Sequence, residues 1–172
     1  MAVMLAVYLA VVRGNKVALV ETMDRDCIRQ AGVVHSNLDK RKFKFFNKKI
    51  SIFSQSDMGQ ISEIVSGDYD YVVLDLGADF DSARQFFLLC NFKMVIGNLV
   101  WWKLAHFVSF LAKTESMPKH KWCFLANNVN TKAYAYFKHK FKIKIGAIPY
   151  EEDPFFLSEK TLLFMEQLIR TG

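Results

Sequence analysis

Short runs of apolar residues that each end in a carboxylate constrain the fold of this chain most strongly. In one run, four apolar residues at 71–74 are followed by Asp75. A second run has four apolar residues at 17–20, followed by Glu21. Runs without polar alternation predict strands that are buried on both faces, as in parallel sheets. The two carboxylates therefore end two such strands.

Helix-like segments alternate with strand-like segments along the rest of the chain. We expect helices over 2–12, 24–30, 56–65 with Ser56 as cap, 81–90, 101–112, 131–140 and 157–169. We expect strands over 16–21, 32–35, 69–75, 92–97, 121–125 and 141–148, and an edge hairpin over 40–53 with its turn at Asn47. This alternation predicts an α/β fold with a mostly parallel sheet and helices on both faces. We expect residues 1–172 to form a single domain with its own core.

Asp75 lies at the predicted carboxyl end of its strand, the edge where open α/β sheets bind ligands. A carboxylate at this edge can bind Mg²⁺ directly or through water. Aspartate also forms turns and caps helices at the ends of strands. The strand alone therefore leaves metal binding and turn formation equally open.

The charge of the chain favours acidic partners in a general way. The formal net charge is +6, which suits a nucleotide, a nucleic acid or an anionic lipid. Lysines and aromatic residues are interleaved in two segments, 40–49 and 132–144. Such segments can bind single-stranded nucleic acid by stacking and charge. Lysines also guard edge strands and form solvated faces, and we favour this second interpretation.

Three widely spaced cysteines, Cys27, Cys90 and Cys123, show no metal-ligand spacing. They predict reduced thiols in a cytoplasmic protein. The apolar start, residues 1–12, has no basic residue ahead of it and is too short to span a bilayer. We therefore expect neither a signal peptide nor a transmembrane segment.

The order of these segments resembles that of the ParA/MinD-type ATPases, the deviant-Walker (SIMIBI) branch of the P-loop NTPases, which includes TadZ-like pilus-assembly relatives. Four segments carry the resemblance. Residues 6–21 resemble the family's first helix and second strand, and residues 70–75 resemble its Walker B strand. Residues 125–128 (Leu-Ala-Asn-Asn) resemble its adenine-contacting segment, and residues 145–150 (Ile-Gly-Ala-Ile-Pro-Tyr) resemble its Leu-Gly-x-Ile-Pro-x signature. The resemblance extends over almost the whole chain.

This resemblance implies ATP and Mg²⁺ as cofactors. It implies that Asp75 is the catalytic, Mg²⁺-linked carboxylate and that Glu21 is the neighbouring acidic residue. It places Asn127 or Asn128 together with Pro149 at the adenine. The implied function is an ATPase that dimerises on ATP and positions or assembles a cellular machine, with a pilus, secretion or partition protein as its partner.

The sequence departs from the family pattern in two ways. It contains no glycine-rich phosphate loop and no strand ahead of the first helix, and Met23 stands where the family has a second aspartate. Three interpretations remain open: an N-terminally truncated ATPase, a non-catalytic scaffold of a pilus or secretion system, and a basic nucleic-acid-binding module. Because the family's first strand lies in mid-sheet, we expect its neighbours to pair with each other, to recruit a strand from another copy, or to leave the fold marginally stable.

Overall fold

The computed structural model describes residues 1–22, 42–45, 49–54, 56–127 and 130–171. The chain divides into two compact units, and each is described by itself. Unit 1 comprises Met1–Leu89 and Asp153–Leu157, and unit 2 comprises Cys90–Glu152 and Ser158–Gly172. The predictions for 24–30, 32–35 and the turn at Asn47 fall outside the described residues.

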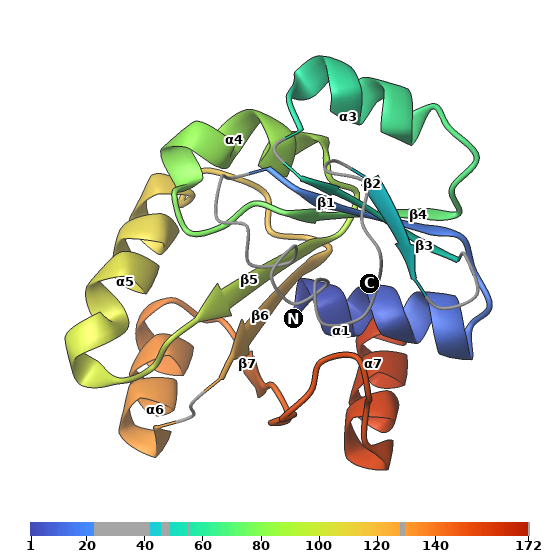
Figure 1. The fold of residues 1–172 in the computed structure, drawn as a ribbon. Coiled ribbons are helices and arrows are strands. Elements are labelled where there is room, and N and C mark those ends of the chain that lie inside the picture. The colour runs from blue at the N-terminus through green and yellow to red at the C-terminus, as the bar shows by residue number, and fades with distance from the viewer. Residues whose placement is uncertain (23–41, 46–48, 55, 128–129, 172) are drawn as a thin grey trace. The chain divides into compact units, whose positions relative to one another are not determined.

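Unit 1 contains a four-stranded, mostly parallel sheet with the strand order β2-β3-β1-β4. Strand β1 lies between β3 and β4 and is parallel to both, whereas β2 is antiparallel to β3. Figure 1 shows α1 and α3 on opposite faces of this sheet. The elements are α1 (Ala2–Val7), η1 (Tyr8–Val12), β1 (Val17–Glu21), β2 (Lys42–Phe45), β3 (Ile50–Ser54), α3 (Met58–Val65), β4 (Tyr71–Asp75) and α4 (Phe80–Leu89).

The core of unit 1 forms where helices α3 and α4 cover one face of the sheet. Its buried members are Ala18, Val20, Ile61, Ile64 and Phe86, and Val72 and Leu74 of β4 pack against them. Helix α3 begins with a capping box in which Asp57 accepts from the backbone N–H of Gln60. The predicted cap, Ser56, is therefore wrong by one residue, because the Asp57 carboxylate takes this position.

Unit 2 contains a three-stranded parallel sheet with the strand order β5-β6-β7. Figure 1 shows α5 and α6 on one side of these strands and α7 on the other. Phe107 of α5 contacts Phe124 of β6 and Phe137 of α6, with ring centroids 6.4 and 5.0 Å apart. The elements are β5 (Lys93–Gly97), η2 (Trp101–Lys103), α5 (Leu104–Lys113), β6 (Trp122–Ala126), α6 (Thr131–Lys140), β7 (Ile145–Ala147) and α7 (Glu159–Thr171).

The predicted α/β class with mostly parallel strands is confirmed, and two strands differ from expectation. Strand β4 is fully buried only at Val73, because it has one strand partner in its sheet instead of two. Strand β7 is limited to three residues, since the chain at Lys142 adopts a positive φ of 54°. Strands β4 and β5 belong to different sheets. None of the described helices is long and apolar enough to cross a bilayer.

Candidate functional site

Two predicted site residues, Glu21 and Asp75, are direct neighbours at the carboxyl edge of the unit 1 sheet. They end β1 and β4 and are register partners in the parallel ladder. Neighbouring strands lie about 4.8 Å apart, and residues in register point to the same face. Glu21 is buried, with 5% of its surface exposed, whereas Asp75 is half-buried. The structure therefore brings the two carboxylates together.

Several hydrogen bonds fix the position of Asp75. Its Oδ1 accepts from the backbone N–H of Gly77 at 3.1 Å, and Gly77 adopts a φ of +66° that favours glycine. Its backbone carbonyl accepts from both the N–H and the Oγ1 of Thr22, each at 3.1 Å. Asp75 therefore does form a turn, and this turn uses one of its two carboxylate oxygens.

The start of α1 lies close to Asp75. Burial lowers the pKa of the Met1 α-amino group, and the Asp75 carboxylate opposes this effect by favouring the charged amine. Helix α1 also packs against β1 and β4. The carboxyl edge of these two strands is consequently enclosed on the α1 side.

Ser54 adds a hydroxyl group to the same row of strand ends. It is the last residue of β3 and the register partner of Glu21. Its Oγ is buried and has no hydrogen-bond partner among the described residues. A buried polar atom of this kind is uncommon in proteins and is often explained by a bound water or ion.

The oxygen atoms of Glu21, Ser54 and Asp75 are of the type that binds Mg²⁺ together with part of its water shell. Mg²⁺ is usually held by one or two carboxylates, with water and phosphate oxygens completing the octahedron. The described residues contain no cluster of three or more histidine, cysteine, aspartate or glutamate side chains that could hold a metal. The protein would thus supply only part of the coordination shell.

The residues predicted for the adenine pocket lie in unit 2. Asn127 follows β6 and is exposed, and Pro149 follows β7 and is buried. The two strand ends are adjacent, since the N–H of Ile148 donates to the carbonyl of Ala126 at 2.9 Å. Asn128 lies outside the described residues. This pair and the two carboxylates of unit 1 belong to separate units.

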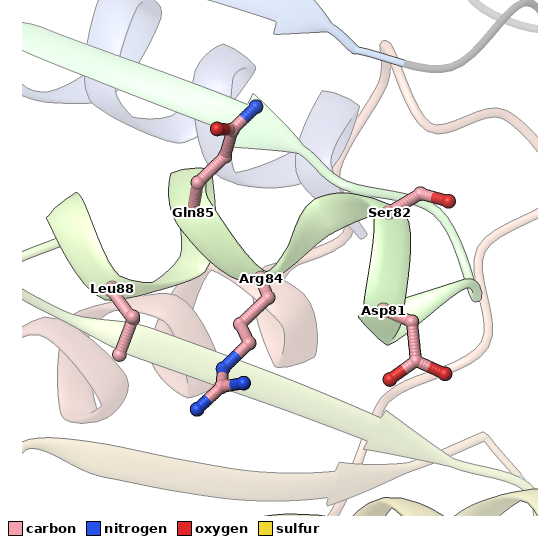
Figure 2. Close-up of a pocket in the computed structure, with 5 residues that line it drawn as sticks. All are labelled: Asp81, Ser82, Arg84, Gln85 and Leu88. Atoms are coloured by element: carbon pink, nitrogen blue, oxygen red, sulfur yellow. The ribbon is translucent and has the colours of Figure 1, made fainter.

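A surface depression on α4 contains none of the predicted site residues. Figure 2 shows its lining, which comes from this helix alone: Asp81, Ser82, Arg84, Gln85 and Leu88. Its volume is about 400 Å³. All of the lining residues are exposed, and we assign no ligand to it.

Of the two lysine-rich segments, 132–144 lies in unit 2. Lys138, Lys140, Lys142 and Lys144 are all exposed, and the Lys140 ammonium lies over the ring of Tyr136 at 5.3 Å. This arrangement agrees with a solvated face, while nucleic-acid binding stays a prediction. Side chains of the other segment, 40–49, are described only at Lys49.

Sequence reasoning missed Thr22 and Ser54. Thr22 directly follows a strand that ends in a carboxylate, and Ser54 ends the neighbouring strand. A polar residue at the end of each apolar run was the signal that could have found them. Their importance depends on the register, which the sequence does not contain.

Comparisons with known proteins give matches only at the level of structure. No family model matches the sequence, and no curated protein matches it. The MinC:MinD cell division protein complex of Aquifex aeolicus aligns with a TM-score of 0.68 and 16% identity, covering 98% of this chain and 88% of that chain. This chain has the fold of the MinD and ParA ATPases.

Two further structures share the MinD/ParA fold. A plasmid partition protein from Borrelia burgdorferi, bound to AMPPNP, has a TM-score of 0.60 and 15% identity, with 99% and 90% of the two chains covered. A ParA family ATPase from Chlorobium tepidum has a TM-score of 0.60 and 14% identity, with 99% and 84% covered. The fold expected from the resemblance is thereby confirmed, whereas its deviant-Walker and TadZ-like details stay predictions.

Proposed function

We propose that this chain is a MinD/ParA-like protein that associates with Mg²⁺ and a nucleotide and serves in positioning or assembling a cellular machine. The observation that carries the proposal is the pairing of Glu21 and Asp75 in register, with the unpartnered Ser54 hydroxyl beside them. Support also comes from the shared fold, because one protein that has it was solved with AMPPNP bound.

In this proposal Asp75 binds Mg²⁺ directly or through water, and Glu21 and Ser54 hold ordered water next to it. When bound, Mg²⁺ would neutralise part of the negative charge of the nucleotide phosphates. Thr22 keeps the main chain of Asp75 in place through its two hydrogen bonds. Asn127 or Asn128, together with Pro149, would border the adenine through an amide and an apolar ring.

The proposal assigns binding to these residues and assigns turnover to none of them. A glycine-rich loop normally provides the backbone N–H groups and the lysine that hold the nucleotide phosphates. The printed sequence has no such loop. The catalytic roles of Asp75 and Glu21 therefore remain implications of the resemblance.

Thermal unfolding with and without Mg²⁺ tests the proposal. Isothermal titration calorimetry with Mg²⁺, and then with Mg²⁺-ATP, measures binding directly. We expect millimolar Mg²⁺ to raise the melting temperature of the wild type and to leave Asp75→Asn unchanged. The asparagine oxygen can still accept from Gly77, so this variant keeps the turn and loses the charge. Asp81→Asn, at an exposed position of α4, is the matched control and should respond like the wild type. Equal responses in all three proteins would refute the site.

A protein-interaction scaffold is the second candidate function. Three aromatic residues of unit 2 that follow β5 and β7 are unusually exposed: Trp101 at 53%, Trp102 at 81% and Tyr150 at 84%. The carboxyl ends of parallel strands share one edge, and tryptophan and tyrosine dominate the binding energy of protein interfaces. If this function holds, Trp102→Ala abolishes capture of the partner and leaves the Mg²⁺ response intact.

A further inference from the structure

The positive charge of the chain is concentrated in unit 2. This unit contains twelve lysine and arginine residues but only five aspartate and glutamate residues, whereas unit 1 is close to neutral. Because β5, β6 and β7 are parallel, their amino ends share one edge of the unit 2 sheet. Helix α6 connects β6 to β7 and therefore ends at the same edge. We call five lysines at this place the basic edge: Lys121, Lys138, Lys140, Lys142 and Lys144.

The lysines of the basic edge have no carboxylate partners in the part of the chain that the structure describes. All five are exposed, and the ion pairs seen there include none of them. Three of the five carboxylates of unit 2, Glu151, Glu152 and Glu159, come after the opposite end of β7. Lysines without partners are almost never buried, because an unpaired charge would lose its hydration. The basic edge therefore stays in water whichever other surfaces of unit 2 are covered.

Backbone strain marks two of these lysines. Lys121 and Lys142 have positive φ angles of 58° and 54°, and no other described residue apart from glycine has one. Each precedes a strand, and counting back from the ladder pair of Phe124 and Ile145 places the two lysines at equivalent positions. Glycine adopts this conformation without the steric cost that a lysine Cβ brings. A lysine at both positions therefore indicates that its charge is used.

We propose that the basic edge binds a segment of a partner protein that is rich in aspartate and glutamate. Lys142 and Lys144 lie in the segment that leads from α6 to β7, and Lys138 and Lys140 lie in the last turn of α6. An ammonium group is a compact point charge with three donors, which suits single carboxylates. This inference is independent of the proposed function, because it needs neither Mg²⁺ nor a nucleotide.

The side chains of the basic edge favour an acidic peptide over a nucleic acid. All five charges belong to lysine, whereas the arginine fork is the better match to phosphate. The Lys140 ammonium lies 5.3 Å from the ring centre of Tyr136 and 5.6 Å from that of Phe141. Bases that stack on these rings, as in the binding of single-stranded nucleic acid, would have to displace this ammonium.

The end of α6 gives a further reason to expect a peptide. The last carbonyl groups of a helix lack donors within the helix, and they form the negative end of its dipole. A peptide has backbone N–H groups that can donate to these carbonyls, in addition to its carboxylates. A DNA backbone has no donors and would bring phosphates towards the negative end of the helix. The mixture of ammonium and carbonyl groups therefore suits an acidic peptide.

Fluorescence anisotropy tests this inference on the full chain, in EDTA and at about 0.15 M salt. The probe is a fluorescein-labelled peptide of alternating glutamate and serine, and the same peptide with glutamine in place of glutamate is its control. We expect the glutamate peptide alone to bind, and Lys142→Gln with Lys144→Gln to weaken it about tenfold, since each exposed ion pair contributes a few-fold. Lys103→Gln with Lys132→Gln is the matched control, because these exposed lysines follow the carboxyl ends of β5 and β6. Absence of binding, or equal weakening by the two double variants, overturns the proposal.

Glycine variants separate binding from folding. Lys121→Gly and Lys142→Gly each remove a charge and relieve a left-handed conformation. We expect both to melt at no lower temperature than the wild type and to bind the glutamate peptide more weakly. Undiminished binding by both variants overturns the proposal. So does tighter binding of a DNA duplex, or of vesicles containing phosphatidylserine, than of the peptide. The Mg²⁺ response of Asp75→Asn remains a separate result.

Discussion

Replacing Thr22 by valine isolates one contact that holds Asp75. The change removes the hydroxyl that donates to the Asp75 carbonyl at 3.1 Å and keeps the shape of the side chain. It also keeps the Thr22 N–H bond to the same carbonyl, at 3.1 Å. Asp75 therefore loses one of two donors to its backbone, while its carboxylate is not altered.

The expected cost follows from the value of a neutral hydrogen bond. Such a bond contributes about 0.5–1.5 kcal/mol, and the carbonyl is not left without a donor, so no further desolvation penalty applies. If exchange occurs through local opening, this cost corresponds to amide exchange roughly 2- to 13-fold faster in β1 and β4. Thr22→Ser keeps the hydroxyl and should exchange much more like the wild type.

Hydrogen exchange resolved by residue is the right assay because all three tryptophans, Trp101, Trp102 and Trp122, lie in unit 2. Tryptophan fluorescence would report on unit 2 and would not report directly on Thr22. Protection of the valine variant equal to that of the wild type would refute the reasoning. So would a serine variant that is as unprotected as the valine variant.

Three further predictions concern stability away from the carboxylates. Asp57→Ala removes the cap of α3 and should cost about 1 kcal/mol in urea unfolding, with Asp57→Asn largely unaffected. Gly97→Ala should cost about 1–3 kcal/mol, because the added Cβ would lie 3.0 Å from the Phe107 ring; an additional Phe107→Leu change should recover part of this in a double-mutant cycle. Hydrogen bonds from Ser158 hold the pKa of Glu151 below its ordinary value, so the stability it contributes is present above a pH of roughly 4.3 and is lost as the pH falls through the folded pKa. Melting curves of the wild type and Glu151→Gln should therefore converge in acid, and a constant difference at every pH would contradict this.

Two segments in unit 2 show what sequence reasoning could and could not predict. The helix predicted over 131–140 is observed with the same limits, and the Asn130 side chain caps its start by accepting from the N–H groups of Lys132 and Ala133. The strand predicted over 141–148 shrinks to Ile145–Ala147. Phe141 instead ends α6 and stacks on Phe137, with ring centroids 5.6 Å apart. The alternation of apolar and basic residues over 141–148 is typical of a strand, but the contact of Phe141 with Phe137 keeps the start of this segment at the end of α6.

Strands β1 and β4 have nearly the same composition and different burial. Every residue of β1 is buried, whereas only Val73 of β4 is. Composition predicts that a strand is apolar enough to be buried on both faces. Whether the strand is in fact buried depends on its position in the order of strands in the sheet. The order β2-β3-β1-β4 arises from tertiary packing and cannot be obtained from the sequence alone.

The candidate site, like the fold, could be predicted only in part from the sequence. Glu21 and Asp75 could be placed together because both end apolar strands, and parallel strands share their carboxyl edge. Thr22 and Ser54 could not, because serine and threonine at strand ends are common and gain meaning only from the register. Asn127 belongs to unit 2, whereas the two carboxylates belong to unit 1.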